Sequence, residues 1–198
     1  AGGGDGTLRA VASALAGTGV TMGVLPAGTL NHFARDLEIP LDVAAAAETA
    51  AAGIPLEVDV AEVNGRVFIN NASLGIFPTY RFERVRRERR GRGRLPAFLG
   101  AVWSAFRRYP FLQVALEVNG RRVVRRTPYL VIGNNEHAME GFRPWERERM
   151  NEGLLWIYIA RDRTRRGLLR VALKVLTGRL RAEDEFEVLH APEVRVET

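Results

Sequence analysis

The sequence contains no cysteine, which excludes disulfides and thiolate metal sites. It also has no apolar run near the roughly 20 residues that a membrane-spanning helix needs. Its first residues lack the basic and apolar parts of a secretory signal. These absences predict a soluble chain, and the lack of cysteine fits a reducing cytoplasm.

Lysine is almost absent, since Lys174 is the only one among the 29 lysine and arginine residues. The net charge of +6 therefore rests on arginine, whose planar guanidinium binds phosphates through two parallel hydrogen bonds. The densest cluster is RVRRERRGRGR, residues 84–94, which fits either an anionic partner or a solvated helix end and loop. It contains no aromatic residue on which a nucleic-acid base could stack, and we expect no nucleic-acid partner.

The first 55 of the 198 residues follow an α/β pattern. Apolar spacing predicts a helix over residues 7–16, closed by glycine, and residues 20–25 predict a buried parallel strand before Pro26. Residues 41–52 are mostly strong helix formers and predict a second helix that stops at Gly53.

After Pro55 the pattern becomes mainly antiparallel β. Asn64-Gly65 and Asn119-Gly120 each join two alternating segments and predict hairpins, whose open edges could support a homodimer. The further elements expected are helices over residues 95–110 and 164–180 and strands over residues 153–160 and 186–198. We therefore place a domain boundary near residue 55.

The segment GGGDGT, residues 2–7, concentrates glycine around one carboxylate. Gly3, Gly4 and Gly6 have no Cβ, so their amides can approach a ligand closely. A helix starting directly afterwards would add unpaired amides and a positive dipole end that favour an anion. The pattern predicts a phosphate-binding loop, although it is neither a Walker A sequence nor a dinucleotide fingerprint. A flexible terminus would also be rich in glycine.

A second segment, LPAGTLNHFARDL at residues 25–37, supports the phosphate-binding interpretation. Successive strands of a parallel α/β sheet deliver their loops to one edge, so the loops at Gly4 and Gly28 can flank the same nucleotide. Asn31 could fix backbone or ligand, and Asp5 could hold a magnesium ion against phosphate oxygens.

Six segments now occur in a recognisable order: GGDGT, PAGTLNHFARDL, VDV, FINNASLG, VIGNN and NEGLL. Together they resemble the diacylglycerol kinase and sphingosine kinase catalytic-domain family over nearly the whole chain. The resemblance implies a bacterial lipid kinase that uses ATP and Mg²⁺. It also implies an α/β plus β fold, with a partial Rossmann-like nucleotide domain (1–55) of phosphofructokinase or NAD kinase type, then a mainly antiparallel β-sandwich lipid domain (56–198).

The resemblance further implies a set of ATP-binding residues, with Asp5 as the catalytic residue at the phosphates and magnesium. This set is Gly3, Gly4, Asp5, Gly6, Thr7, Leu8, Arg9, Gly28, Thr29 and Asn31. His32 stands where the family usually has an acidic residue. A structural magnesium of the family would be held by the Glu152 carboxylate and the carbonyls of Arg149 and Leu154, unless Glu152 simply starts a strand.

The family's general base belongs to an Asp-Gly-Glu that would lie further along the chain than Thr198, and the family carries another strand and helix before GGDGT. We therefore expect the 198-residue chain by itself to transfer no phosphate. His32, His137 and His190 occur in unrelated contexts, and we expect them to be structural.

The substrate implied is a diacylglycerol-like or sphingoid-like lipid at a membrane surface. Residues 95–106 would receive acyl chains, residues 84–94 would contact anionic phospholipid, and the protein would be cytoplasmic and peripheral to the inner membrane. Two alternatives stay open: a kinase resembling NAD kinase, and a non-catalytic lipid- or nucleotide-binding protein.

Overall fold

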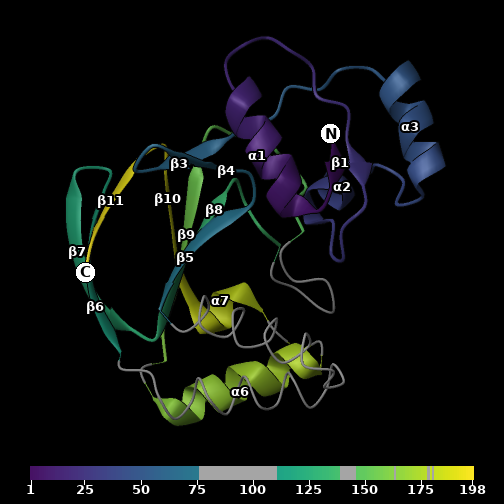
Figure 1. Cartoon of the computed structure of the whole chain (residues 1–198). Helices are drawn as coiled ribbons and strands as arrows, with labels where there is room; N and C mark the ends of the chain where they lie inside the picture. The colour runs from purple at the N-terminus through teal and green to yellow at the C-terminus, as the bar shows by residue number, and fades with distance from the viewer. Residues whose placement is uncertain (76–110, 139–145, 163, 178, 180) are drawn as a thin grey trace. The chain divides into compact units, whose positions relative to one another are not determined.

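The structure is a computed structural model that describes residues 1–75, 111–138, 146–162, 164–177, 179 and 181–198 (Figure 1). Among the helices in these ranges, none combines the length and the apolar character that crossing a membrane requires. The predicted helix over residues 95–110 and the arginine cluster at residues 84–94 lie outside the described residues.

The chain divides into two compact units, both built from separated segments. Unit 1 comprises Ala1–Ala72, Gly133–Ala138 and Trp145–Leu155, and unit 2 comprises Ser73–Ile132, Met139–Pro144 and Trp156–Thr198. The boundary proposed near residue 55 instead divides the chain into two continuous domains. That boundary stays a prediction.

Helices and short strands alternate at the start of unit 1. In chain order they are β1 (Gly2–Gly3), α1 (Asp5–Leu15), β2 (Leu25–Pro26), α2 (His32–Asp36), α3 (Val43–Ala52), β3 (Ala61–Val63) and β4 (Arg66–Phe68). β3 and β4 form the hairpin predicted at Asn64-Gly65, and both turn residues have positive φ.

The parallel strand predicted over residues 20–25 is shorter than expected. Only Leu25–Pro26 form β2, paired in parallel with Gly2–Gly3 of β1. β1 also has two residues, and these are the ones that pair with β2. Gly23 still receives a hydrogen bond from the amino group of Ala1, at 2.6 Å.

The two long helices of unit 1 lie within two residues of their predicted bounds: α1 begins two residues and ends one residue earlier than predicted, and α3 begins two residues later and ends at Ala52 as predicted. α1 is followed by Gly17, which adopts φ 74° and stops the helix. α3 starts one residue after Asp42, whose carboxylate accepts from the Ala45 amide at 3.0 Å and caps the helix. The core of unit 1 joins α1, α2 and the β4 end through Leu8, Ala12, Val24, Phe33, Ala34, Ile69 and Met150.

Antiparallel strands dominate the remaining chain. Its elements are β5 (Asn71–Gly75), β6 (Leu112–Val118), β7 (Arg121–Thr127), β8 (Tyr129–Asn134), β9 (Leu155–Ala160), α6 (Arg165–Leu176), α7 (Ala182–Glu185), β10 (Phe186–Ala191) and β11 (Val194–Glu197). One sheet has the order β11-β6-β7 and is antiparallel throughout, and another has the order β10-β9-β8-β5. The fold is therefore mixed α/β with antiparallel sheets, as predicted, while the Rossmann-like and sandwich details stay predictions.

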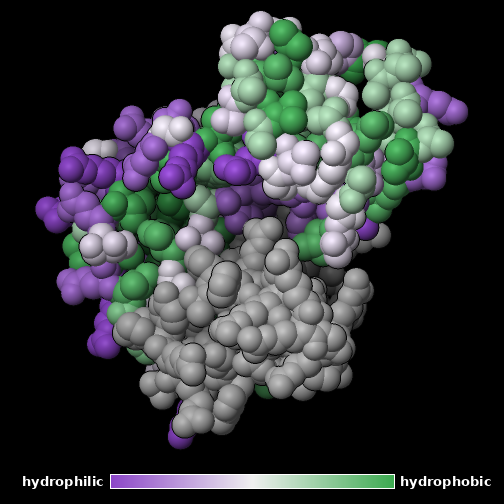
Figure 2. Space-filling model, in the orientation of Figure 1, coloured by the Kyte–Doolittle hydropathy of each residue, from purple (hydrophilic) through white to green (hydrophobic). Residues whose placement is uncertain are grey.

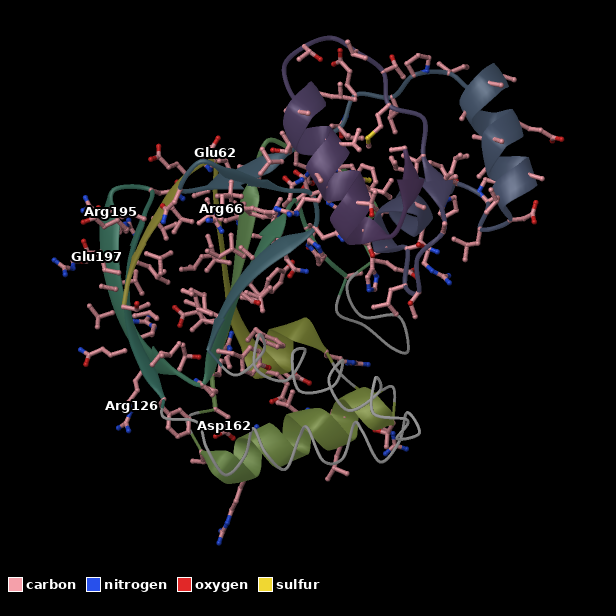
Figure 3. The ribbon with its side chains drawn as sticks, viewed as in Figure 1. Glu62, Arg66, Arg126, Asp162, Arg195 and Glu197 are labelled. Atoms are coloured by element: carbon pink, nitrogen blue, oxygen red, sulfur yellow. The ribbon has the colours of Figure 1, made fainter. Side chains whose placement is uncertain are left out.

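The outward face of the three-stranded sheet carries charges of both signs. Glu197 forms ion pairs with Arg122 at 3.5 Å and with Arg195 at 3.4 Å. Figure 3 shows Arg195 and Glu197 projecting from the sheet. Hydrophilic residues gather over this sheet in Figure 2. Because β7 is an edge strand, its arginines protect a backbone edge that could otherwise pair with another chain. The proposed homodimer stays a prediction.

The core of unit 2 lies between strands, as the alternating pattern predicts. Leu116, Val118, Leu130, Ile157, Ile159 and Ala191 form one buried cluster. α6 is tied to α7 by Glu185, whose buried carboxylate contacts Lys174 at 2.6 Å and Arg170 at 3.3 Å. The only lysine of the chain therefore has a structural partner.

Gly75, at the end of β5, provides a test of this packing. It has φ +94°, and a Cβ there would meet the Pro128 carbonyl and lie 3.0 Å from the Tyr129 Cα. Gly120 has φ +74° with open space around it, so Gly120→Ala isolates the backbone cost of about 1 kcal/mol. We expect Gly75→Ala to lower the free energy of unfolding by about 1–3 kcal/mol more than Gly120→Ala, measured by denaturant titration. Equal losses would contradict the close approach.

Candidate functional site

The two glycine-rich loops lie at one edge, as the sequence predicts, and contact each other; that they flank a nucleotide stays a prediction. After the paired strands β1 and β2, the Ala27 amide still donates to the Gly3 carbonyl at 3.1 Å. A Cβ on Gly4 would lie 3.2 Å from the Gly28 Cα, and a Cβ on Gly28 would overlap the Gly4 Cα. The loops can therefore lie this close only because both positions are glycine.

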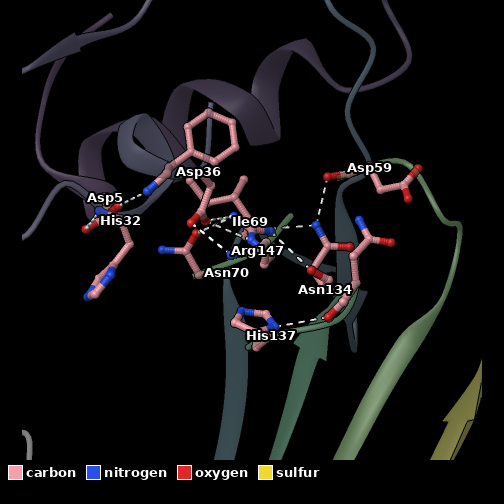
Figure 4. A network of polar contacts seen from close by, with 11 residues as sticks. Asp5, His32, Asp36, Asp59, Ile69, Asn70, Asn134, His137 and Arg147 are labelled. Atoms are coloured by element: carbon pink, nitrogen blue, oxygen red, sulfur yellow. Dashed lines mark hydrogen bonds and ion pairs between the residues drawn. The ribbon is translucent and has the colours of Figure 1, made fainter. Parts of the chain in front are cut away.

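The Asp5 carboxylate holds the start of α2. One carboxylate oxygen accepts from the Phe33 amide at 2.9 Å, and the other accepts from the His32 amide at 3.3 Å (Figure 4). Asp5 thereby satisfies two of the amides that the first turn of a helix leaves without an intrahelical partner. Asp5 was predicted as a phosphate-site residue. Its contact with α2 was not predicted, because the two segments meet only in the folded chain.

Asn31 closes the second loop on itself. Its side chain accepts from the Gly28 amide at 2.9 Å and donates to the Gly28 carbonyl at 3.0 Å. The residue is buried and has φ 51°, a left-handed conformation that asparagine tolerates better than most residues. Asn31 therefore fixes backbone, which is one of the two roles that the sequence left open for it.

The other predicted ATP-binding residues occupy different environments. Gly6, Thr7, Arg9 and Thr29 are exposed and accessible to a ligand. Leu8 is completely buried in the core of unit 1, where it anchors α1 below the loop. Their roles in binding ATP stay predictions.

A buried ion pair that the sequence analysis missed lies beside these loops. The Arg147 guanidinium contacts the Asp36 carboxylate at 2.7 Å through Nη2 and at 2.8 Å through Nε, and the side chains are 0% and 1% exposed. Asp36 was part of the quoted second segment, but neither it nor Arg147 differs in sequence pattern from the many exposed charged residues.

Four N–H groups of the Arg147 guanidinium have hydrogen-bond acceptors. Nη1 donates to the Ile69 carbonyl at 2.6 Å and to the Asn134 carbonyl at 3.1 Å, and Nη2 donates to the Asn70 side chain at 3.0 Å. Nε donates to the Asp36 carboxylate, which also forms the ion pair with Nη2. A buried charge is tolerated when it is paired and hydrogen-bonded in this way.

The segments VDV, VIGNN and NEGLL converge in unit 1 through Asn134 and Asp59. Asn134 donates to the Asp59 carbonyl at 2.8 Å, and the Asp59 carboxylate accepts from the Gly153 amide at 2.6 Å. The Asp59 amide in turn donates to the Met150 carbonyl at 2.7 Å. These bonds join three stretches that are far apart in the sequence.

Other groups already contact two of the three predicted metal ligands. Glu152 accepts from the Glu136 amide at 3.4 Å and lies 3.9 Å from the Arg149 guanidinium, whose charge competes with a cation. The Leu154 carbonyl accepts from the Asn135 amide at 2.9 Å. In the described part of the chain, no three histidine, aspartate or glutamate side chains cluster as a metal site would require. The predicted site has one carboxylate and two backbone carbonyls, so it would not form such a cluster, and metal binding by Arg149, Glu152 and Leu154 stays a prediction.

His137 is buried next to the Arg147 network. Its Nδ1 lies 3.0 Å from the Asn135 carbonyl, which can only accept, so Nδ1 carries the proton. Burial, reinforced by the charge of Arg147, lowers the pKa of His137 to about 3. Burial also raises the pKa of the Asp36 carboxyl, and Arg147 opposes that rise. His137 is therefore neutral at physiological pH, and its structural role stays a prediction.

Comparison with known proteins identifies the family. The profile described as "Diacylglycerol kinase catalytic domain" matches residues 1–63, and the profile described as "YegS C-terminal NAD kinase beta sandwich-like domain" matches residues 81–198. The chain belongs to the YegS-like and diacylglycerol kinase family. This confirms the resemblance found in the sequence.

Individual relatives in this family agree. A diacylglycerol kinase of Bacillus subtilis is 30% identical over 182 residues, covering 90% of this chain and 59% of that protein. A probable lipid kinase YegS-like of Pseudomonas aeruginosa is 51% identical over 81 residues, covering 38% of this chain and 25% of that protein.

The fold is similar as well. A crystal structure of a diacylglycerol kinase from Bacillus anthracis has a TM-score of 0.68 at 22% identity, covering 98% of this chain and 64% of that one. This YegS-like chain thus spans less than two thirds of the length of these family members.

His137 predicts how stability depends on pH. Because its native pKa is lowered from 6.5 to about 3, the unfolded chain binds the proton first, and stability falls as the pH drops below about 6.5. The loss is about 1.4 kcal/mol per pH unit, or about 2 kcal/mol between pH 7 and pH 5. We expect His137→Gln, which keeps a donor for Asn135, to lose about 2 kcal/mol less than the wild type over this range.

The measurement is denaturant unfolding at several pH values. Asp36 is present in both proteins, so its contribution cancels in the comparison. The same pH dependence in both proteins would show that His137 is not held neutral.

Proposed function

We propose that the protein is an ATP-dependent kinase that transfers the γ-phosphoryl group to a hydroxyl of a diacylglycerol-like or sphingoid-like lipid. The observation that carries the proposal is the contact of the Gly4 and Gly28 loops at the ends of two parallel strands. Loops at this edge of a parallel sheet are where α/β proteins bind nucleotides. The membership of the lipid kinase family supports the same reaction.

The loops supply what phosphate binding requires. Exposed Gly6 and Thr7 lie at the start of α1, an eleven-residue helix whose positive dipole end favours an anion. The Thr7 amide itself donates to the Gly4 carbonyl at 2.9 Å, which leaves the Thr7 hydroxyl for a ligand. Arg9 follows on the exposed surface of the same helix. We infer that these groups hold the phosphates of ATP, with exposed Thr29 of the second loop close by.

Phosphoryl transfer depends mainly on positioning and charge stabilisation. The lipid hydroxyl oxygen forms a bond to Pγ, the bond from Pγ to the β–γ bridging oxygen breaks, and ADP leaves while the hydroxyl proton passes to a base. Magnesium bound with ATP would neutralise phosphate charge beside Asp5. Among the described residues His137 is unsuited as that base, because its pKa of about 3 makes it a weak acceptor.

The direct test is transfer of radiolabelled phosphate from ATP by the protein expressed from its complete gene. Diacylglycerol, a sphingoid base and NAD are offered side by side, so that a lipid kinase, an NAD kinase and a non-catalytic binding protein give different results. Label found only in NAD would contradict the proposal and indicate an NAD kinase. A protein that binds ATP but labels none of the three substrates would be a non-catalytic binding protein.

Asp5→Asn tests the role of the carboxylate in this reaction. The amide keeps the size of the side chain but removes the charge, and it retains one acceptor for the amides of α2. We expect kcat to fall about 10²–10³-fold, comparable to the loss of a group that stabilises the transition state. Glu48→Gln on the exposed face of α3 is the matched control and is expected to retain wild-type kcat.

Membrane contact is tested separately by liposome sedimentation. We propose that the arginines of residues 84–94 bind anionic phospholipid, each contributing about 1 kcal/mol. The bound fraction should rise with phosphatidylserine content and fall with added salt, because surface charge is screened. Binding that depends on neither phosphatidylserine content nor salt would contradict the proposed contact between these arginines and anionic phospholipid.

A further inference from the structure

α2 is held at both ends by charged side chains from other segments. At its start, the Asp5 carboxylate accepts the amides of His32 and Phe33. At its end, Asp36 is the last helical residue and is paired with buried Arg147. A five-residue helix is far too short to be stable alone, so these outside contacts and its packed core residues fix its position.

The Arg147 end of this arrangement is anchored to the rest of unit 1. Its guanidinium is bonded to the backbone after β4 at Ile69 and to the end of β8 at Asn134. Its own amide donates to the second Asp36 oxygen at 3.2 Å. Arg147 therefore fixes the position of Asp36 relative to β4 and β8.

The Asp5 end of the arrangement belongs to the glycine loops. Asp5 follows Gly4 directly, and Gly4 contacts Gly28. The carboxylate can lie at the phosphates only where the α2 amides hold it, because both of its oxygens are bonded to them. A shift of α2 would therefore move Asp5 or break its bonds.

We propose that Arg147 is a positioning residue for nucleotide binding, which acts through Asp36 and α2 to fix the carboxylate of Asp5. The inference rests on the proposed function, since it assigns Asp5 to the ATP site. Arg147 itself touches neither phosphate nor lipid in this account.

The test must separate positioning from folding. Removing Arg147 alone leaves a buried unpaired carboxylate, which destabilises any protein. The double variant Asp36→Leu/Arg147→Met replaces the pair with apolar side chains of similar volume, an exchange that buried ion pairs often tolerate. The matched control is Arg125→Met/Glu187→Leu, which removes a paired arginine and glutamate held by two 2.8 Å contacts in unit 2.

Two readouts are measured on the full chain: the Kd for ATP with Mg²⁺ by calorimetry, and hydrogen exchange of the His32 and Phe33 amides. We expect the Asp36→Leu/Arg147→Met variant to bind ATP about tenfold more weakly, or about 1.4 kcal/mol, and to exchange both amides faster. The control variant should match the wild type in both readouts. A folded double variant with wild-type Kd and wild-type protection of these amides would overturn the inference.

Two further outcomes are decisive. If the wild-type protein does not bind ATP, the proposed function is wrong. If the His32 and Phe33 amides are as protected in the double variant as in the wild type, the link from Arg147 to Asp5 is wrong, whatever the result for ATP. If the double variant does not fold, Arg147→Lys replaces it, because lysine keeps the charge but offers three donors instead of five. Wild-type Kd and amide protection in Arg147→Lys would overturn the inference, and weaker ATP binding with faster exchange would support it.

Discussion

The buried pair of Arg147 and Asp36 is the constraint on which the arrangement of unit 1 depends. Moving two charges out of water is costly, and the cost is offset only when every donor and lone pair finds a partner. Here four guanidinium N–H groups donate to acceptors from three separate stretches of the chain, and Nη2 also forms an ion pair with Asp36. Because those acceptors have fixed positions, the pair is compatible with few arrangements of the backbone around it.

A second constraint is steric and lies at the glycine loops. Gly4 and Gly28 approach so closely that a side chain on either one would displace the other loop. The polar network and the glycine contact act on the same short helix, α2, from opposite ends. The order of segments thus has a physical meaning in this chain: Asp5 of GGDGT is bonded to Phe33 of PAGTLNHFARDL, and Arg147 bonds that segment to VIGNN.

Local features of the fold could be predicted from the sequence because they depend on local signals. The Asn-Gly hairpins, the glycine stop after α1 and the helix over residues 43–52 follow from turn geometry and helix propensity, which act over a few residues. The strand predicted over residues 20–25 was too long, because the length of β2 depends on its pairing with β1. The spacing of apolar residues does not show which strand will pair with them.

The candidate site was predictable only in part. The two glycine loops were found because glycine clusters before a helix are a local pattern with a known use. Arg147 was missed because a buried arginine has no local signature in a sequence with 29 lysine and arginine residues. The same holds for the bond from Asp5 to α2, which exists only after residues 5 and 33 meet.

The segmented composition of unit 1 has a consequence for its synthesis. Its first stretch ends at Ala72, but Arg147 belongs to a stretch that ends at Leu155. As the chain emerges from the ribosome, Asp36 has no countercharge from Arg147 until more than a hundred further residues have been translated. If Arg147 positions Asp5 as proposed, the loops at Gly4 and Gly28 acquire their final geometry only after residue 147 has been made.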